Sequence, residues 1–481
     1  MNVQERQILL TALEKLSHRE SENIEPTEEI FLPLPAHALA LRPEIVIVRG
    51  GRGAGKSALF RLLNSVDGTK RLRRLLGDER VPDAKWVEAF AQSSQHPDVT
   101  PLDQYGKEAS SESLRAFWMA HLLLRVNEEL PDLVEVPDKL HNAWLKHRTD
   151  LNSWVPIAQS HLGAIAQALD QVERALQAKK QLIFATYDHL DRIGSFDPSV
   201  RRRYVGALLA LWLSYSNRYR NLRAKIFLRD DLLDAGELGF PDASKLRARS
   251  VSIEWDVESL YRVVVRHMAQ NTSLREWLGR LSTGRHALEL EKRGDFGWFP
   301  GPMSDETQYK FATLLAGDVM GSGTKKGYTY RWIPNHLQDA QGRIVPRSML
   351  CLIGFAGQEA LKHPLGNGVR LITPQDLLTS LQETSSTRVG EIKEEYELVI
   401  RLENLRGLRL LLDPDEVVER VSKPVLLLNE KPGLSTDGRA VVDELVRLGV
   451  LSIRSDGRID VPDIYRYGFG ILRKGGVARA R

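Results

Sequence analysis

The chain has 481 residues, of which 42% are hydrophobic and 27% charged, and this balance excludes an intrinsically disordered protein. Its longest apolar run, residues 204–213, is too short to span a membrane, and the net charge of +4 is too small to indicate nucleic-acid binding by itself. The single cysteine, Cys351, excludes an internal disulfide, and the scattered histidines form no zinc motif, so we expect a cytoplasmic protein of several domains.

The first residues, MNVQERQILLTALEKL, lack the charged and apolar regions of a signal peptide. They predict an amphipathic helix instead, because Leu9, Ala12, Leu13 and Leu16 fall on one helical stripe. We expect residues 1–42 to form this helix and a lead-in to the first domain.

Residues 44–63, EIVIVRGGRGAGKSALFRLL, predict a short strand at 45–48, a glycine-rich loop and a helix. The loop fits G-x-x-x-x-G-K-[ST], the phosphate-binding P-loop. Glycines let the backbone N–H groups converge on an anion, and the helix adds the positive end of its dipole. The residues expected to contact a nucleotide are Gly50, Gly51, Arg52, Gly53, Ala54, Gly55, Lys56, Ser57 and Ala58.

Two residues of this loop have specific expected roles. Lys56 is expected to reach the β- and γ-phosphates, and the hydroxyl of Ser57 to coordinate Mg²⁺. The alternative is a glycine-rich connection that matches by chance. The strand before the loop and the helix after it favour the P-loop.

A long helical segment separates this loop from the next clear strand. Residues 110–130 and 160–180 predict long helices, so we expect a helical insertion at about 70–180 within a P-loop core at 43–256. Phe117 and Trp118 in this insertion are expected to be core residues rather than a base-stacking platform.

A P-loop needs an acidic residue at the end of a second strand to hold Mg²⁺, directly or through water. In KQLIFATYDHLDRIG, residues 180–194, a predicted strand at 182–185 is followed by Asp188 and Asp191. We expect Asp188 to hold the water shell of Mg²⁺ and Asp191 to help orient the attacking water. The alternative is a D-x-x-D turn that only caps the following helix.

The next predicted strand, residues 225–228, ends at Arg229. Many P-loop ATPases place a polar residue here, between the P-loop strand and the acidic strand, to sense the γ-phosphate. A guanidinium suits this task because it binds phosphate in a bidentate manner. The alternative, a surface ion pair of Arg229 with Asp230 or Asp231, stays open from the sequence.

A fifth strand is predicted at residues 251–255, and Arg247 and Arg249 before it are candidates for an arginine finger acting in trans. Strand and helix signals thus alternate along the first half of the chain. This order predicts an α/β fold with a parallel sheet flanked by helices.

These segments together resemble bacterial STAND and KAP-type P-loop ATPases of the AAA+ kind. The resemblance rests on GGRGAGKS, YDHLDR, the strand-terminal Arg229 and VSIEWDVESLY, and it continues in WIPNHLQDAQGRIVPRSMLCLIGFA, which is similar to the helical lid of that family. It implies a lid at 257–385, in which Arg347 matches the arginine called sensor 2 that contacts bound nucleotide.

The segment 386–481 is expected to hold a small winged-helix-like module and a basic tail. Within it, VVDELVRLGVLSIRSDGRID predicts a helix, a Leu-Gly turn and two short strands about an Asp-Gly hairpin. The complete expected fold is a P-loop sheet with a helical insertion, followed by the lid and this module.

The resemblance implies ATP and Mg²⁺ as cofactors and an ATPase that acts as a nucleotide-dependent switch or assembly scaffold. It also implies a homo-oligomer or a partner effector, in bacterial defence against phage. One position departs from the family, because His189 stands where many members have a second acid. Either Asp191 substitutes for that acid, or hydrolysis is slow.

The alternative function is a DNA-handling ATPase, such as a loader or a transposition-type regulator, that binds duplex DNA through the winged helix. Basic runs at residues 68–74, 201–203 and 473–481 favour it, while the low net charge does not. We therefore regard DNA as a less favoured partner, and no membrane partner is expected.

Overall fold

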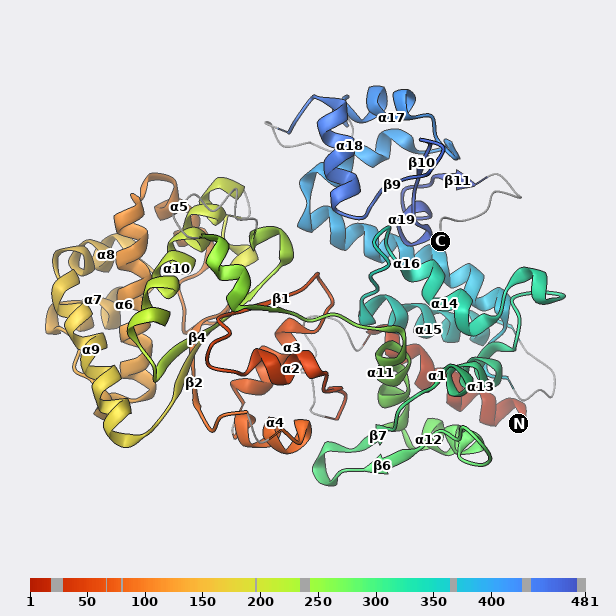
Figure 1. Ribbon diagram of the computed structural model, residues 1–481, viewed down its shortest axis with the longest axis horizontal. Helices are drawn as coiled ribbons and strands as arrows, with labels where there is room; N and C mark the ends of the chain where they lie inside the picture. Colours follow the sequence, from red (N-terminus) through yellow and green to blue (C-terminus); the bar gives the residue numbers. More distant parts are fainter. Residues whose placement is uncertain are drawn as a thin grey trace. The chain divides into compact units, whose positions relative to one another are not determined.

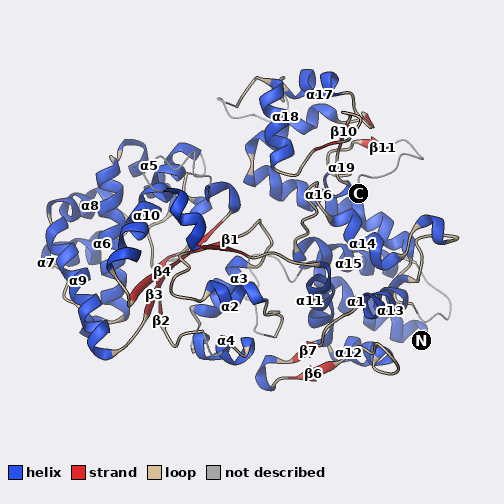
Figure 2. Ribbon diagram, in the orientation of Figure 1, coloured by secondary structure: helices blue, strands red, loops and turns tan. Residues whose placement is uncertain are grey.

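The computed structural model describes residues 1–18, 29–65, 67–78, 81–194, 197–233, 243–363, 370–425 and 434–473. The chain divides into two compact units (Figure 1). The sheet unit consists of Pro33–Gly51 and Gly55–Ile253, and the helical unit of Met1–Leu32, Arg52–Ala54 and Glu254–Arg481. Figure 2 shows the main group of strands, in red, within the sheet unit.

A five-stranded sheet in the order β2-β3-β4-β1-β5 forms the centre of the sheet unit. All four neighbouring pairs are parallel, which confirms the α/β fold class. The fifth strand is shorter than predicted, because the chain then leads to Asp256, the N-cap of the next helix. The strands are β1 (Ile47–Arg49), β2 (Lys85–Phe90), β3 (Ile183–Tyr187), β4 (Leu222–Leu228) and β5 (Ser250–Ser252).

Helices make up most of the remaining sheet unit. The range expected as a helical insertion also contains β2, whose KWVEAF pattern is half polar and gives a weak strand signal. Phe117 and Trp118 are fully buried, which confirms them as core residues. The helices are α2 (Pro35–Ala40), α3 (Lys56–Leu63), α4 (Gly68–Leu76), α5 (Val99–Glu108), α6 (Ser111–Glu129), α7 (Asp138–His147), α8 (Leu151–Ser160), α9 (Leu162–Lys179) and α10 (Pro198–Arg218).

The buried carboxylate of Glu173 on α9 fixes the start of β4. It accepts backbone N–H groups from Arg220 at 2.8 Å, Asn221 at 3.1 Å and Leu222 at 2.8 Å. Removing it leaves these donors unsatisfied, and each such loss costs roughly 1–3 kcal/mol.

We expect Glu173→Ala to lower the free energy of unfolding by about 3 kcal/mol, since solvent restores part of the lost bonding. Urea unfolding of the whole chain measures the change. The exposed Glu135→Ala is the matched control and should stay within about 0.5 kcal/mol of the wild type. A loss of less than about 1 kcal/mol for Glu173→Ala would show that the carboxylate does not organise β4.

A buried histidine makes stability depend on pH. His37 on α2 is 1% exposed, and its Nδ1 accepts the N–H of Leu34 at 3.0 Å. Burial lowers the pKa of His37 from 6.5 to about 3. Between these values the unfolded chain binds a proton that the folded chain does not, so the free energy of unfolding falls as the pH drops below 6.5.

We expect the wild type to lose about 2 kcal/mol more than His37→Gln between pH 6.5 and pH 5, from the slope of about 1.4 kcal/mol per pH unit. Glutamine can still accept the N–H of Leu34 but does not titrate. Urea unfolding at each pH measures the difference, and parallel losses in the two proteins would contradict it.

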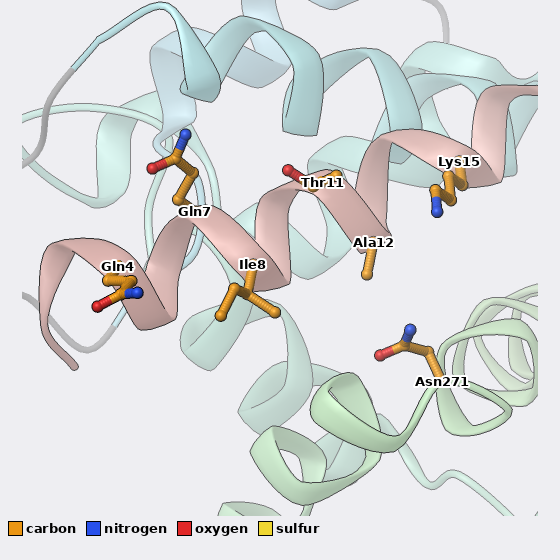
Figure 3. Close-up of a pocket in the computed structure, with 7 residues that line it drawn as sticks. All are labelled: Gln4, Gln7, Ile8, Thr11, Ala12, Lys15 and Asn271. Carbon is orange, nitrogen blue, oxygen red and sulfur yellow. The ribbon is translucent and has the colours of Figure 1, made fainter.

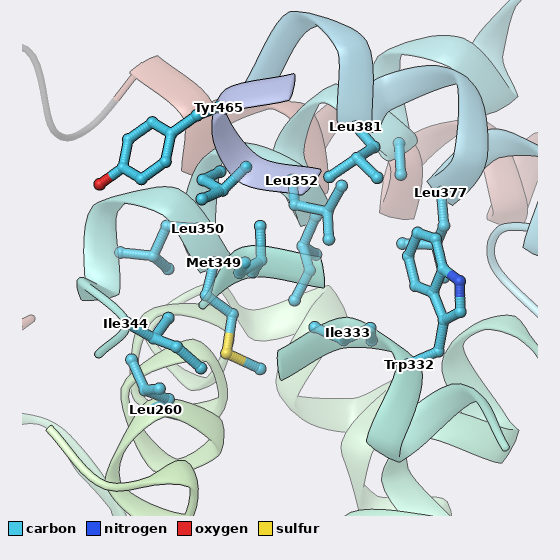
Figure 4. Packing of buried hydrophobic residues seen from close by; sticks show 14 of the residues in the cluster. Leu260, Trp332, Ile333, Ile344, Met349, Leu350, Leu352, Leu377, Leu381 and Tyr465 are labelled. Atoms are coloured by element: carbon cyan, nitrogen blue, oxygen red, sulfur yellow. The ribbon is translucent and has the colours of Figure 1, made fainter. Parts of the chain in front are cut away.

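The helical unit begins with the predicted amphipathic helix, which packs its apolar stripe against α15. Gly354 and Gly357 allow this contact, since a Cβ on Gly354 would lie 2.4 Å from the backbone nitrogen of Ser17. Figure 4 shows Trp332, Met349 and other side chains of the core of this unit. Its first helices are α1 (Val3–His18), α11 (Val257–Ala269), α12 (Thr272–Leu278), α13 (Asp305–Ala316), α14 (Thr329–Leu337), α15 (Pro346–Leu361) and α16 (Pro374–Glu395), with a hairpin of β6 (Leu290–Lys292) and β7 (Trp298–Pro300).

A winged-helix-like module ends the helical unit, as predicted. The hairpin pairs Ile453 with Ile459, and Gly457 in its turn has a φ of 83°, which favours glycine. The basic tail predicted after residue 473 lies outside the described residues. The elements are β8 (Arg409–Leu410), α17 (Pro414–Val421), α18 (Gly438–Arg447), β9 (Ser452–Ile453), β10 (Ile459–Asp460), α19 (Asp463–Arg466) and β11 (Leu472–Arg473).

Across the described ranges, we find no helix with the length and apolarity that crossing a bilayer requires.

Candidate functional site

The predicted nucleotide-site residues of the sheet unit follow three adjacent strands. The P-loop follows β1, Arg229 follows β4 and Asp188 follows β3, and β4 lies between the other two. Arg49 at the end of β1 pairs with Leu228 at the end of β4. Because these strands are parallel, their carboxyl ends meet at one edge, where ligands bind in open α/β sheets.

The P-loop leads directly into α3, which begins at Lys56 with Gly55 as its N-cap. Gly53 and Gly55 have φ values of 81° and 95°, the left-handed region that glycine reaches without strain. The ammonium of Lys56 donates to the carbonyl oxygens of Gly50 at 2.7 Å and Gly51 at 3.0 Å. The charge is therefore held against the loop, next to the positive end of the α3 dipole.

The tip of the loop, Arg52–Ala54, packs within the helical unit. The carbonyl oxygen of Ala54 accepts the indole N–H of Trp255 at 2.9 Å. A Cβ on Gly53 would lie 3.2 Å from the Cβ of Arg347, so the loop tip passes close to the predicted lid arginine.

Arg347 lies at the start of α15, and its guanidinium donates to Glu391 on α16 at 2.9 Å. Sequence reasoning missed the α16 residues around Glu391, because nothing local marks them as neighbours of a loop more than 300 residues earlier in the chain.

Asp188 lies immediately after β3 and is 4% exposed. Its backbone N–H donates to Phe90 at 2.9 Å, and its Oδ1 accepts the N–H of His189 at 2.8 Å. Its Oδ2 is buried and accepts no hydrogen bond from the described residues. A buried carboxylate oxygen without a donor is costly, so Asp188 fits a cation or a water of its hydration shell.

Few of the described protein side chains near Asp188 could bind a metal, which suits Mg²⁺ with water and phosphate oxygens as its remaining ligands. No group of three or more His, Cys, Asp or Glu side chains that could hold a metal occurs among residues 1–473 outside the undescribed gaps. Mg²⁺ commonly takes only one or two protein ligands and completes its shell with water and phosphate oxygens. Asp188 and the half-buried Ser57 in the first turn of α3 are the residues that would hold it.

Asp191 and Arg229, predicted separately, are brought together. Arg229 is 7% exposed, and its Nη1 lies 3.6 Å from the Oδ2 of Asp191. Asp230 pairs with Arg49 at 3.0 Å. Arg229 is therefore a buried arginine at the sheet edge, and the side chain of Asp231, its other predicted partner, lies outside the described ones.

His189 adopts a left-handed backbone conformation with a φ of 58°. Its Nδ1 accepts the N–H of Gln92, in the segment after β2, at 3.4 Å. Its Nε2 lies 3.9 Å from the Oδ2 of Asp188, too far for a hydrogen bond. The residue that departs from the family pattern thus stands beside the predicted metal ligand.

The two arginine-finger candidates lie before β5. Arg249 donates to the side chain of Asn217 at 2.7 Å, and Arg247 is exposed. Their action on a neighbouring subunit stays a prediction.

One open cavity lies over the polar side of α1 in the helical unit (Figure 3). Its volume is about 460 Å³, and Gln4, Thr11, Lys15 and Asn271 are among its lining residues. Its lining residues include no carboxylate, histidine or cysteine, so we assign it no chemistry.

No protein-family model matches the chain, and no curated protein matches its sequence. Among solved structures it is similar to the ORC2 protein of Aeropyrum pernix in ADPNP–ADP complexes, with 11% identity, a TM-score of 0.32 and coverage of 95% of this chain and 98% of that one. It is also similar to A. pernix ORC1 in complex with DNA (11%, 0.35, 95% of each chain) and to a Walker-type ATPase of Pyrococcus abyssi (11%, 0.34, 90% and 92%). Similarity this loose carries no inference about function, and the resemblance to STAND and KAP-type ATPases stays a prediction.

Proposed function

We propose that the protein binds ATP with Mg²⁺ at the carboxyl edge of its parallel sheet and hydrolyses it. The observation that carries this proposal is the buried Oδ2 of Asp188, which accepts no hydrogen bond from the described residues. Asp188 follows β3, the strand next but one to β1, and β1 leads into the glycine loop that holds the Lys56 ammonium. A bound cation would pair with the Asp188 carboxylate, and a bound anion would pair with the Lys56 ammonium.

Each residue then has a definite task. Lys56 exchanges two loop carbonyls for phosphate oxygens, which form stronger charge-assisted hydrogen bonds. Ser57 and Asp188 hold Mg²⁺ or its waters, and the metal supplies neutralisation of phosphate charge. The γ-phosphate competes with Asp191 for the guanidinium of Arg229, which leaves the Asp191 carboxylate able to orient a water.

Hydrolysis is expected to be slow. The position after Asp188 is an imidazole rather than a carboxylate, and the Oδ2 of Asp191 lies 3.6 Å from Arg229. We expect a turnover number below about 1 s⁻¹, at the low end of ordinary enzymes, which suits a switch that stays in its ATP-bound state.

Titration calorimetry with ATP and with GTP, each with and without Mg²⁺, tests the proposal. We expect saturable ATP binding that weakens when EDTA removes Mg²⁺, and phosphate release that requires the metal. Lack of nucleotide binding under all four conditions would rule out the nucleotide site.

We propose further that the nucleotide state controls assembly with further copies of the chain or with a partner effector. A role in defence against phage rests on the sequence resemblance alone. Arg347 as a nucleotide contact has the same basis, and its Nη1 also donates to Glu391.

The basic residues at 201 and 203 and those paired in the winged-helix-like module give little support to the DNA-handling alternative. Arg201 and Arg203 donate to backbone carbonyls of their own unit, at 2.9 Å and 2.7 Å. In the winged-helix-like module, basic side chains pair with acids of the same module: Arg447 with Glu444, Arg458 with Asp456, and Arg454 and Arg473 with Asp460. These charges are largely neutralised before any phosphate backbone arrives.

Mass measurement of the protein with ATP, with duplex DNA and with both separates these possibilities. We expect a mass increase with ATP and none with DNA. A salt-dependent, sub-micromolar DNA affinity would favour the loader-type alternative instead.

A further inference from the structure

The last turns of α16 hold the tip of the P-loop, and all the residues involved belong to the helical unit. The backbone N–H of Arg52 donates to the Oε1 of Glu395 at 2.7 Å. The guanidinium of Arg388 donates to the carbonyl oxygen of Arg52 at 3.3 Å. The side chain of Arg52 pairs with Glu394. One helix thus binds both backbone polar groups and the side chain of a single loop residue.

A buried ionic network supports this contact. Arg388 donates to Glu391 at 2.9 Å, Glu391 also accepts from Arg347, and Arg388 and Glu391 are each 8% exposed. Burial acts to lower the pKa of Arg388, but Tyr465, Glu395 and Glu391 together raise it above its ordinary value. The arginine therefore stays charged, and such charge-assisted bonds in a buried setting are stronger than neutral ones.

The same stretch of α16 also holds the C-terminal module. The hydroxyl of Ser385 donates to the carbonyl of Ile464 in α19 at 2.7 Å and accepts the N–H of Gly468 at 2.8 Å. A Cβ on Gly468 would lie 2.7 Å from Val389, so α19 and its following turn are seated directly on α16. Residues 385–395 therefore connect α19 to the loop tip through one continuous helix.

We propose that Glu395 and Arg388 are positioning residues for the phosphate loop, and that α16 passes the state of the loop tip to α19 of the winged-helix-like module. This rests on the proposed function, because the loop must bind nucleotide for its position to matter. A packed helical segment bonded at Ser385 and at Glu395 moves as a unit, so a displacement of Arg52 also displaces Ser385.

The first arm of the test needs no nucleotide. Trypsin cleaves after Arg52 only when the loop tip opens. The cleavage rate therefore reports the tether, by which we mean the bonds of Arg52 to Glu395 and Arg388. We expect Glu395→Ala to raise that rate about tenfold, as for the loss of a charge-assisted bond of about 1.4 kcal/mol. Glu395→Gln, which keeps the acceptor oxygen, should lie between Ala and the wild type. Glu383→Gln removes a charge from an exposed position of the same helix and should match the wild type. Equal cleavage in Glu395→Ala and the wild type would overturn the tether.

The second arm measures ATP affinity and hydrogen exchange of residues 463–469 with and without ATP in the same variants. We expect Glu395→Ala to weaken ATP binding about five- to tenfold, and ATP to change exchange in the wild type but not in this variant. Equal ATP affinity, or an unchanged exchange response, in a variant with faster cleavage would overturn the positioning role. If the wild type binds no ATP, the proposed function fails and the positioning role falls with it, while the cleavage rates still decide whether the tether exists.

Discussion

Replacement of Lys56 by alanine is expected to weaken ATP binding about 1000-fold, or roughly 4 kcal/mol, without unfolding the protein. The ammonium would form charge-assisted hydrogen bonds to two phosphates, each worth roughly 1.5–3 kcal/mol, and alanine forms none. Lys56 donates to the carbonyl oxygens of Gly50 and Gly51, which belong to a loop and not to the apolar core. Titration calorimetry measures the affinity, and circular dichroism checks the fold.

Lys70→Ala is the matched control, because Lys70 is exposed on α4 and pairs only weakly with Asp67 at 3.5 Å. It should bind ATP as the wild type does. If Lys56→Ala also keeps the wild-type affinity, Lys56 does not contact phosphate and the P-loop assignment is wrong.

The second large effect is expected at Asp188. Asp188→Asn should leave ATP affinity within about threefold but lower Mg²⁺-dependent turnover about 1000-fold, because the amide keeps the shape and loses the charge that holds the metal shell. The Oδ2 is buried without a donor, so removal of the charge also relieves a desolvation cost. We therefore expect the variant to be as stable as the wild type or slightly more stable.

Steady-state phosphate release over a Mg²⁺ titration measures this change. Asp191→Asn serves as the comparison, since Asp191 lies near Arg229 rather than next to the orphaned oxygen. It should lower turnover less than Asp188→Asn does. Normal turnover in Asp188→Asn would exclude Asp188 as the residue that holds the metal shell.

The parts of the site that depend on local spacing could be predicted from the sequence. The pattern of residues 44–63 predicts the order strand, glycine loop and helix, and a short apolar run predicts the buried strand before Asp188. The position of Arg229 at the end of a strand between the other two was also predicted, from where many P-loop ATPases place a polar residue.

The other parts of the fold and of the site could not be predicted, because they depend on contacts between residues far apart in the sequence. The strand β2 has a half-polar sequence, and its place beside β3 comes from pairing between residues as far apart in the chain as Lys85 and Ile183. The bonds of Arg52 to α16 span more than 330 residues, and Glu391 and Glu395 look like ordinary exposed helix charges in the sequence. The pairing of Asp191 with Arg229 depends in the same way on which strands are neighbours.

Hydrogen exchange of the wild type with and without ATP and Mg²⁺ tests the nucleotide site most directly. Protection is expected in peptides that cover residues 50–58 and 186–191, since phosphate and metal would satisfy the loop N–H groups and the Asp188 carboxylate together. Saturating ATP and Mg²⁺ with unchanged exchange in both segments would contradict a nucleotide site at this edge of the sheet.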